Sequence, residues 1–397
     1  MLQMTLLGTS GMCPLPNRAL ASCFVRISGV GFLIDCGEGT QVELQRRKIV
    51  FGDIDYLLIT HLHADHISGM LGILLAMDMQ GRQKPLKIFG PKGLKSYIMS
   101  FERFIRGIGF KYDVEEIESV STYNLPSNNS ASKIKLKVGL SEHSVRCYCY
   151  SLELIRNKKF NENADSLKNL PLFSRRFLAS GRDILYNENI YYAKDFLEPA
   201  LKGVKFSYVT DTRPTSYIKN FIANSDIAII EGMYADEAKL DMARKKHHMI
   251  WKESCELVNG NGVKKFILTH FSPSLQINEN LINEFNNMHP TGVVGYDGYS
   301  IDMKFSNEKV IENENKDSIF NDKPLNINKV GLIFKFYQDN NYGKIKNVEA
   351  ITDFKYLVFL GNGKVDTVFI YKSPQSMKEE FNDFYRYDDY YLFVRFM

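Results

Sequence analysis

The stretch of sequence that decides the fold is Thr60-His61-Leu62-His63-Ala64-Asp65-His66. Two histidines on one face of a helix lie three or four positions apart, whereas His61 and His63 are two positions apart. This spacing places them on extended or loop backbone, directly after a strand expected at residues 56–60. Four potential metal ligands within six residues predict a metal site at the end of that strand. The other interpretation of the isolated cluster is a solvated polar loop with accidental histidines.

Three more potential ligands lie at or just past the carboxyl ends of other expected strands. His143 follows a strand-like run, Asp211 follows residues 206–210, and His270 follows residues 266–269. Sheets of α/β proteins commonly place their active sites at this edge. Seven ligands from four loops suffice for two metal ions. Imidazole and carboxylate without thiolate favour Zn²⁺, with Mn²⁺ or Fe²⁺ as alternatives, and disfavour a closed structural zinc site.

Composition limits the class of protein. The chain has 397 residues, of which 44% are hydrophobic, and this predicts two or three globular domains with an ample core. A formal net charge of +4 is too small to indicate nucleic-acid binding, so contact with a polyanion needs a local basic surface. No apolar run reaches the roughly 18–20 residues of a membrane span, and we expect no membrane contact and a cytoplasmic location. Six cysteines without CxxC spacing predict reduced, buried thiols.

The order of apolar runs predicts an α/β fold. Residues 1–8 predict a first strand, and the runs at 24–27 and 31–34 predict a hairpin closed by Ser28-Gly29. Strand-like and helix-like segments then alternate, which indicates a mixed sheet system. The helices expected from this alternation span residues 66–77, 93–104 and 237–258.

Two regions interrupt the alternation. Residues 156–205 are polar and contain ten Lys and Arg against six Asp and Glu, which indicates an inserted basic excursion. Residues 306–329 are rich in Asn, Asp, Glu and Lys and predict a linker. Residues 330–397 predict a small β-rich C-terminal module of unknown role, with strands at 330–337, 356–360 and 367–371.

The ligand pattern and several ordered blocks resemble the ribonuclease Z family of the metallo-β-lactamase superfamily. The blocks are residues 7–9, 32–41, 210–214 and 268–272, together with Pro14 and Arg18. The resemblance covers most of residues 1–305. It implies a four-layer αβ/βα sandwich as the catalytic domain, interrupted by the arm at 156–205.

The resemblance also implies two zinc ions and the side chains that hold them. The ligands are His61, His63 and His143 for one ion, Asp65, His66 and His270 for the other, and Asp211 as the bridge. Asp35 is implied to lie near the site as a partner of a ligating histidine, although an Asp at a turn before Gly37 explains it equally well.

The implied chemistry is hydrolysis of a phosphodiester by a water activated between the metal ions. Asp65 would accept a proton, and His248, oriented by Glu231, would donate one to the leaving group. The implied substrate is precursor tRNA, whose 3′ trailer is removed to leave a 3′-hydroxyl end, and the implied assembly is a homodimer. The arm would contact tRNA phosphates through Lys158, Lys159, Lys168, Arg175, Arg176 and Arg182, although an ordinary solvated loop would have a similar composition.

Three departures from the family pattern accompany the resemblance. The arm lacks a glycine-proline cluster and retains only Leu170-Pro171-Leu172. Pro273-Ser274-Leu275 stands where the family often has an Arg-Tyr pair. The C-terminal module has no counterpart in the short bacterial enzymes.

Other functions of the same fold remain as alternatives. A phosphodiesterase acting on small or cyclic phosphodiesters would use the same ligands without a basic arm. Flavin-partnered di-iron oxidoreductases usually carry Glu at the position of His63 and an added flavodoxin-like domain, and neither feature is visible. A catalytically inactive RNA-binding subunit is disfavoured because every metal position is filled.

Overall fold

The computed structural model describes residues 1–105, 107–129, 132–161, 167–168, 170, 172–186, 189–305, 354–361, 364–371, 383–387 and 390–394. The chain divides into two compact units. The first comprises Met1–Asn157 and Lys202–Asn307, and the second comprises Lys158–Leu201 and Glu308–Met397. None of the described helices combines the length and apolar character that crossing a membrane would require.

The first unit contains two seven-stranded sheets. The first sheet has the order β18-β1-β2-β3-β4-β5-β6, with parallel pairing from β3 to β6. The expected hairpin is confirmed, because β2 and β3 pair antiparallel around Ser28 and Gly29. The strands are β1 (Leu2–Gly8), β2 (Ser22–Ile27), β3 (Val30–Ile34), β4 (Tyr56–Leu58), β5 (Leu86–Pro91), β6 (Tyr112–Ile117) and β18 (Ser300–Met303).

The second sheet has the order β17-β16-β15-β14-β9-β8-β7. Pairing is parallel from β14 to β17 and antiparallel from β7 to β9 and between β9 and β14. The strands are β7 (Ser121–Pro126), β8 (Ser132–Ser141), β9 (Cys147–Arg156), β14 (Lys205–Val209), β15 (Ile227–Glu231), β16 (Phe266–Thr269) and β17 (Gly292–Val294).

A central apolar core joins the facing sides of the two sheets. It includes Phe32 from the first sheet and Phe206 from the second, both fully buried. Two tyrosines of β9 reach across with their rings in this core. The hydroxyl of Tyr150 donates to the carbonyl of Ile59 at 2.5 Å, and that of Tyr148 donates to the carbonyl of Ile117 at 2.6 Å. These bonds satisfy buried hydroxyls and hold the sheets together.

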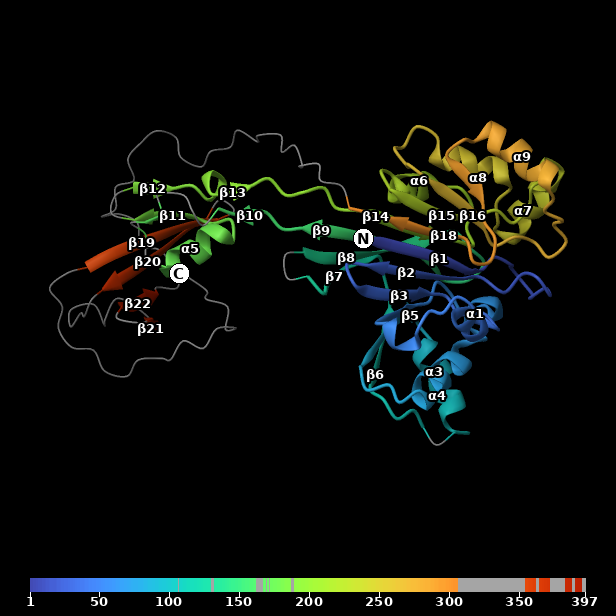
Figure 1. Cartoon of the computed structure of the whole chain (residues 1–397), viewed down its shortest axis with the longest axis horizontal. Helices are drawn as coiled ribbons and strands as arrows, with labels where there is room; N and C mark the ends of the chain where they lie inside the picture. Colours follow the sequence, from blue (N-terminus) through green and yellow to red (C-terminus); the bar gives the residue numbers. More distant parts are fainter. Residues whose placement is uncertain are drawn as a thin grey trace. The chain divides into compact units, whose positions relative to one another are not determined.

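Helices cover the outer face of each sheet, so the first unit is a four-layer αβ/βα sandwich, as expected (Figure 1). On the first sheet lie α1 (Thr40–Arg46), α3 (Met70–Met79) and α4 (Leu94–Glu102), and near them α2 (Ala64–Ile67) and the 3₁₀ turn η1 (Phe51–Asp53). On the second sheet lie α6 (Ser216–Ile222), α8 (Trp251–Val258) and α9 (Glu279–Met288).

Two sequence-based expectations for helices are wrong. The long helix expected at 237–258 is divided into η4 (Glu237–Lys239), α7 (Leu240–Lys246) and α8, because His247 has a left-handed backbone with φ 58° and Ile250 is extended. The helix expected at 66–77 is interrupted after α2, where the Gly69 N–H donates to the Cys36 carbonyl at 2.9 Å. A Cβ at Gly69 would lie 2.2 Å from the Gly37 carbonyl oxygen, so only glycine permits this approach.

The cysteines follow the expectation with one exception. All six are free thiols, and five are buried, but Cys13 is exposed. It lies in the loop between β1 and β2, where neighbouring residues are largely exposed and leave no apolar site for the thiol.

The second unit joins the inserted segment and the C-terminal segment in one sheet. Its order is β12-β11-β19-β20-β22-β21, with β11 and β19 antiparallel. Its strands are β11 (Asp183–Tyr186), β12 (Asn189–Tyr191), β19 (Phe354–Gly361), β20 (Lys364–Tyr371), β21 (Asp383–Tyr387) and β22 (Tyr390–Val394). A short β10 (Lys159–Phe160) and β13 (Leu197–Glu198) pair, accompanied by α5 (Leu172–Ala179) and η3 (Ala193–Asp195).

The strands expected at 356–360 and 367–371 lie within β19 and β20. The linker expected at 306–329 and the strand expected at 330–337 lie outside the described residues.

Candidate metal centre

Three strand ends that surround the site share an unusual backbone. Asp35 follows β3, Asp211 lies just past β14, and His270 follows β16, with φ values of 56°, 50° and 58°. Left-handed backbone at residues other than glycine costs on the order of 1–3 kcal/mol and concentrates at functional sites. In each case the turn directs a carboxylate or imidazole into the carboxyl edge of the sandwich.

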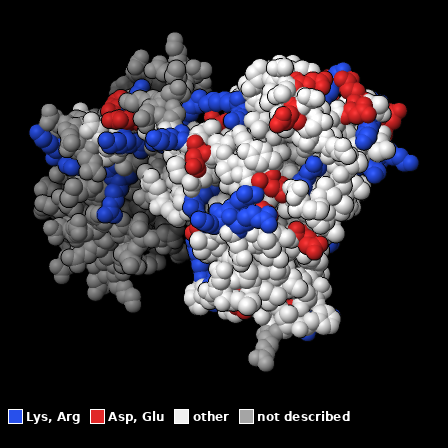
Figure 2. Space-filling view, turned by 45° about the vertical axis from the view of Figure 1, so that its right-hand side comes forward, with Lys and Arg blue, Asp and Glu red and all other residues white. Residues whose placement is uncertain are grey.

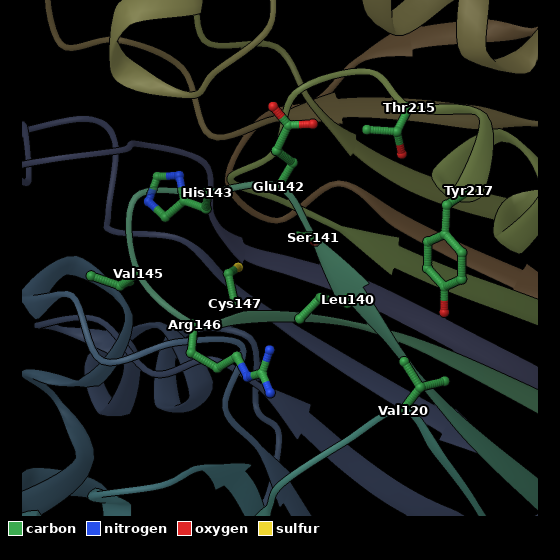
Figure 3. A pocket seen from close by; sticks show the side chains of 10 residues that line it. All are labelled: Val120, Leu140, Ser141, Glu142, His143, Val145, Arg146, Cys147, Thr215 and Tyr217. Carbon is green, nitrogen blue, oxygen red and sulfur yellow. The ribbon is translucent and has the colours of Figure 1, made fainter.

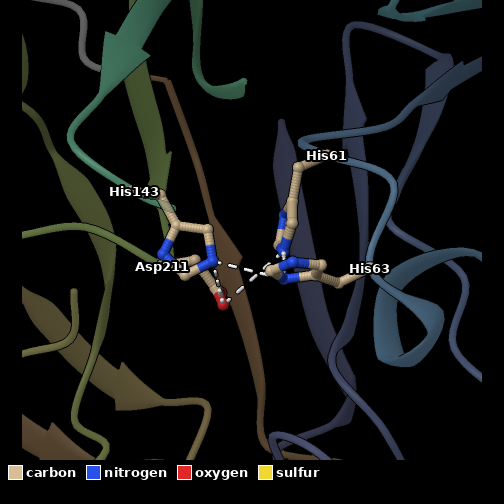
Figure 4. A group of neighbouring side chains, drawn as sticks. All are labelled: His61, His63, His143 and Asp211. Carbon is tan, nitrogen blue, oxygen red and sulfur yellow. Dashed lines mark hydrogen bonds and ion pairs between the residues drawn. The ribbon is translucent and has the colours of Figure 1, made fainter. Parts of the chain in front are cut away.

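The first ligand group comprises His61, His63, His143 and Asp211 (Figure 4). His61 Nε2 lies 3.0 Å from His63 Nδ1, which lies 3.3 Å from His143 Nε2. Asp211 Oδ2 lies 3.7 Å from His61 Nε2 and 3.8 Å from His143 Nε2. Four ligands at about 2.0–2.1 Å from a tetrahedral ion would be about 3.3–3.4 Å apart, so this group is close to the geometry of a metal site.

The second group comprises Asp65, His66 and His270. His66 Nε2 and His270 Nε2 are 3.2 Å apart, and each lies 3.3 Å from Asp211 Oδ1. Asp65 Oδ2 lies 3.6 Å from His66 Nε2 and 3.4 Å from His270 Nε2. The two carboxylate oxygens of Asp211 therefore face different groups, as a bridging ligand would.

The chemistry of the donor set provides a test of whether a cation fits. Asp211 Oδ1 is buried and faces His66 Nε2 and His270 Nε2, each 3.3 Å away. Three potential ligand atoms this close together could share one divalent cation, which would compensate the buried charge of the carboxylate. The donor set of imidazoles and carboxylates suits a divalent metal ion at this place.

Neighbouring groups hold the ligands in orientation. Asp35 accepts hydrogen bonds from the backbone and hydroxyl of Thr60 at 2.8–3.0 Å, and its Oδ2 accepts from His66 Nδ1 at 2.8 Å. This leaves His66 Nε2 directed at the second group. The contact agrees with the first of the two interpretations of Asp35. His143 Nδ1 donates to the His247 carbonyl at 3.3 Å, a partner that the sequence did not indicate, because a backbone acceptor carries no residue signature.

The pKa values of Asp211, His61 and His143 favour the forms that bind a metal ion, whereas that of His66 is shifted in the opposite direction. Burial alone would raise the pKa of Asp211, but His270, His66 and His61 hold it well below its ordinary value. Burial lowers the pKa of His61 well below its usual range and that of His143 to about 4. Ionised carboxylate and neutral imidazole are the ligating forms of these side chains. Burial alone would lower the pKa of His66, but Asp211 and Asp35 raise it well above its usual range, so an ion bound by this ring would displace a proton.

Beside the two groups, Glu231 and His248 form a pair. Glu231 ends β15, is fully buried, and accepts from the Thr212 N–H at 2.7 Å and from His248 Nδ1 at 2.9 Å. Burial alone would lower the pKa of His248, but the Glu231 carboxylate outweighs burial and raises it to about 9. The His248 ring centre lies 5.4 Å from that of His143 and 5.6 Å from that of His270. A protonated imidazole therefore faces the ligand groups at neutral pH.

The arm residues predicted to contact substrate lie in the second unit. Most are exposed, and these are Lys158, Lys159, Lys168, Arg176 and Arg182. Arg175 is half-buried and donates to the Leu167 carbonyl at 2.9 Å, so it holds the arm together. The face shown in Figure 2 carries Lys and Arg in several separate groups with Asp and Glu among them, in keeping with the small net charge.

The sequence of this chain is similar to those of known proteins. A family model described as Anti-Pycsar protein Apyc1 matches residues 2–191, which is less than half of the chain. A protein named Ribonuclease Z from Agathobacter rectalis is 36% identical over 308 residues, covering 78% of this chain and 100% of that protein. The chain belongs to the ribonuclease Z family. Ribonuclease Z of Clostridioides difficile is likewise 36% identical over 305 residues, covering 77% of this chain and 99% of that protein.

A solved structure shows the same fold. The crystal structure of the short form of human tRNase Z superimposes with a TM-score of 0.53 at 20% identity, covering 76% of this chain and 100% of that one. As a member of the ribonuclease Z family with the metallo-β-lactamase fold, the chain is a metal-dependent hydrolase. The alignments with its relatives leave part of this chain unmatched.

Proposed function

We propose that this chain removes the 3′ trailer of precursor tRNA by hydrolysing one phosphodiester with the aid of two zinc ions. The observation that carries the proposal is the position of Asp211 between two ligand groups, with the His248–Glu231 pair beside them. Membership of the ribonuclease Z family supports the substrate class.

Two divalent ions bound here would supply a water of lowered pKa and neutralise charge on the phosphate oxygens. Asp65 would accept a proton from the attacking water, and the Met12 N–H, which donates to its Oδ2 at 2.7 Å, would hold it in place. The water oxygen bonds to phosphorus as the bond from phosphorus to the ribose 3′-oxygen breaks. His248 donates its proton to that oxygen, leaving a 3′-hydroxyl on the tRNA and a 5′-phosphate on the trailer.

Residues 1–305 would form the catalytic domain, and the arm at 156–205 would contact the tRNA body through its exposed lysines and arginines. Such contacts are largely ionic, so the affinity for tRNA should fall steeply as the salt concentration rises.

We further expect a homodimer, in which one subunit's arm contacts tRNA bound at the partner's site. Sedimentation of the protein with and without precursor tRNA tests this assembly.

The deciding experiment incubates the purified chain with a 3′-extended precursor tRNA, with and without a chelator. Cleavage after the discriminator nucleotide that disappears with chelation and returns with Zn²⁺ supports the proposal. Elemental analysis of the purified protein identifies the ions that it holds and distinguishes zinc from manganese or iron. Failure to cleave the precursor, together with hydrolysis of a cyclic nucleotide, would instead identify a phosphodiesterase for small substrates.

A further inference from the structure

A pocket of about 620 Å³ opens beside the candidate metal centre (Figure 3). The carboxyl end of β8, the loop from Glu142 to Arg146 and the first turn of α6 surround it. His143 is both a wall of this pocket and a member of the first ligand group. The pocket therefore adjoins the candidate metal centre, near the place where the scissile phosphodiester would bind.

The walls are mainly apolar and unusually exposed for apolar side chains. Val120, Val145 and Tyr217 are 54%, 41% and 42% exposed, and all three line the pocket. The Tyr217 ring is held in place by stacking on the ring of Phe221, with ring centroids 6.2 Å apart. An exposed aromatic ring that is already ordered is a suitable stacking surface for a planar ligand.

The rim of the pocket carries one acidic and one basic side chain, and the acidic one favours a nucleobase over a phosphate. The Ser141 hydroxyl is buried at the pocket floor, where it interacts with the thiols of Cys147 and Cys149. The exposed Glu142 carboxylate would repel phosphate but accept a hydrogen bond from an exocyclic amino group. Arg146 Nη2 donates to the Glu118 carbonyl at 2.9 Å, which keeps its guanidinium at the pocket wall.

We propose that this pocket binds the base of an unpaired nucleotide that adjoins the scissile phosphodiester, with the base stacked on Tyr217. The inference rests on the proposed function, because an RNA held at the metal centre necessarily places a nucleoside on each side of the reacting phosphate. Proteins recognise single-stranded RNA by stacking such exposed bases on aromatic side chains.

The first test measures kcat and KM on a 3′-extended precursor tRNA with the full-length, metal-loaded protein. Tyr217→Ala should raise KM about five- to a hundredfold, the range expected for loss of one base–aromatic stack. Tyr217→Phe retains the ring and should restore KM to near the unaltered value. Phe104→Ala removes an aromatic ring that is 88% exposed outside the pocket and serves as the matched control. Metal content and thermal midpoint verify that each variant is folded.

The second test replaces, one at a time, each of the two nucleotides flanking the cut by an abasic residue. If the base stacks on Tyr217, one abasic position raises KM in the unaltered protein but has no further effect in Tyr217→Ala. The position that shows this coupling identifies the nucleotide on the tRNA side or on the trailer side.

Two results would overturn the inference. One is a KM for Tyr217→Ala no higher than that for Phe104→Ala, and the other is independent, multiplicative effects at both abasic positions. Either result leaves the proposed function standing as long as the unaltered protein cleaves the precursor. Absence of cleavage by the unaltered protein would instead contradict the proposed function.

Discussion

The Nδ1 nitrogen of His248 lies 2.9 Å from Oε2 of Glu231, and the other oxygen of that carboxylate accepts the Thr212 N–H. Glu231 thereby fixes the orientation of the His248 ring and leaves its Nε2–H available to a substrate. Replacing His248 by Ala should lower kcat on precursor tRNA by on the order of 10²–10⁴, the usual contribution of a general acid. Metal content should remain at the unaltered level. Loss of metal together with activity would show that His248 is a ligand and contradict this role.

The same pair predicts a pH dependence. A general acid must be protonated, and the pKa of His248 is raised to about 9, so kcat/KM should fall as pH rises through that region. Glu231→Gln keeps the side-chain shape but removes the negative charge that raises this pKa. Its alkaline limb should therefore shift to lower pH, and a pH–rate profile of both proteins measures the shift. An unchanged limb would exclude His248 as the titrating group.

A bridging carboxylate makes a different prediction for metal content. Because Asp211 Oδ2 faces the first ligand group and Oδ1 faces the second, Asp211→Asn should weaken both sites together. His63 belongs to the first ligand group alone, so His63→Ala should weaken metal binding mainly at that one site. Elemental analysis after dialysis should give two ions per unaltered chain, fewer than one for Asp211→Asn and about one for His63→Ala. Equal losses in both variants would contradict the bridging role.

Asp35 allows the role of an orienting residue to be measured. Its Oδ2 accepts from His66 Nδ1 at 2.8 Å, and Asp35→Asn would weaken this contact without removing a ligand. Such changes typically cost 10- to 100-fold in metal affinity, and we expect this at the second site. Competition with a chromogenic chelator gives the affinities. Asp53→Asn, at an exposed carboxylate on the same unit, is the control and should leave both affinities unchanged.

The sequence predicted the parts of the site that carry local signatures. The spacing of His61 and His63 excluded a helix, and Asp211 and His270 stand directly past apolar runs that form β14 and β16. Features that depend on tertiary contacts were not predictable in this way. The break between α7 and α8 follows from the left-handed backbone of His247, although residues 237–258 have the composition of one helix. That break is what brings His248 to Glu231.

The pairing of the arm with the C-terminal segment was also beyond prediction. Strands β11 and β19 lie far apart in the sequence, and backbone pairing over such a distance leaves little pattern in either strand. Leu185 and Val358 are opposite each other in this register. Directly opposite residues of antiparallel strands have Cα atoms about 4.5–5.5 Å apart, a distance that a disulfide can span.

This register predicts a specific cross-link. In a Cys13→Ser background, which removes the exposed thiol, Leu185→Cys with Val358→Cys should form a disulfide under mild oxidation. Leu185→Cys with Phe359→Cys is the matched control, because Phe359 pairs with Ile184 and is therefore one position out of register with Leu185. Peptide mapping by mass spectrometry detects the bond independently of activity. Equal cross-linking in both pairs would exclude this register, and cross-linking in neither would exclude the shared sheet. A cross-link in the first pair alone would show that β19 of the C-terminal segment pairs with β11, the strand that directly follows Arg182 of the arm. A variant truncated so that it lacks β19 and everything after it should then bind precursor tRNA more weakly.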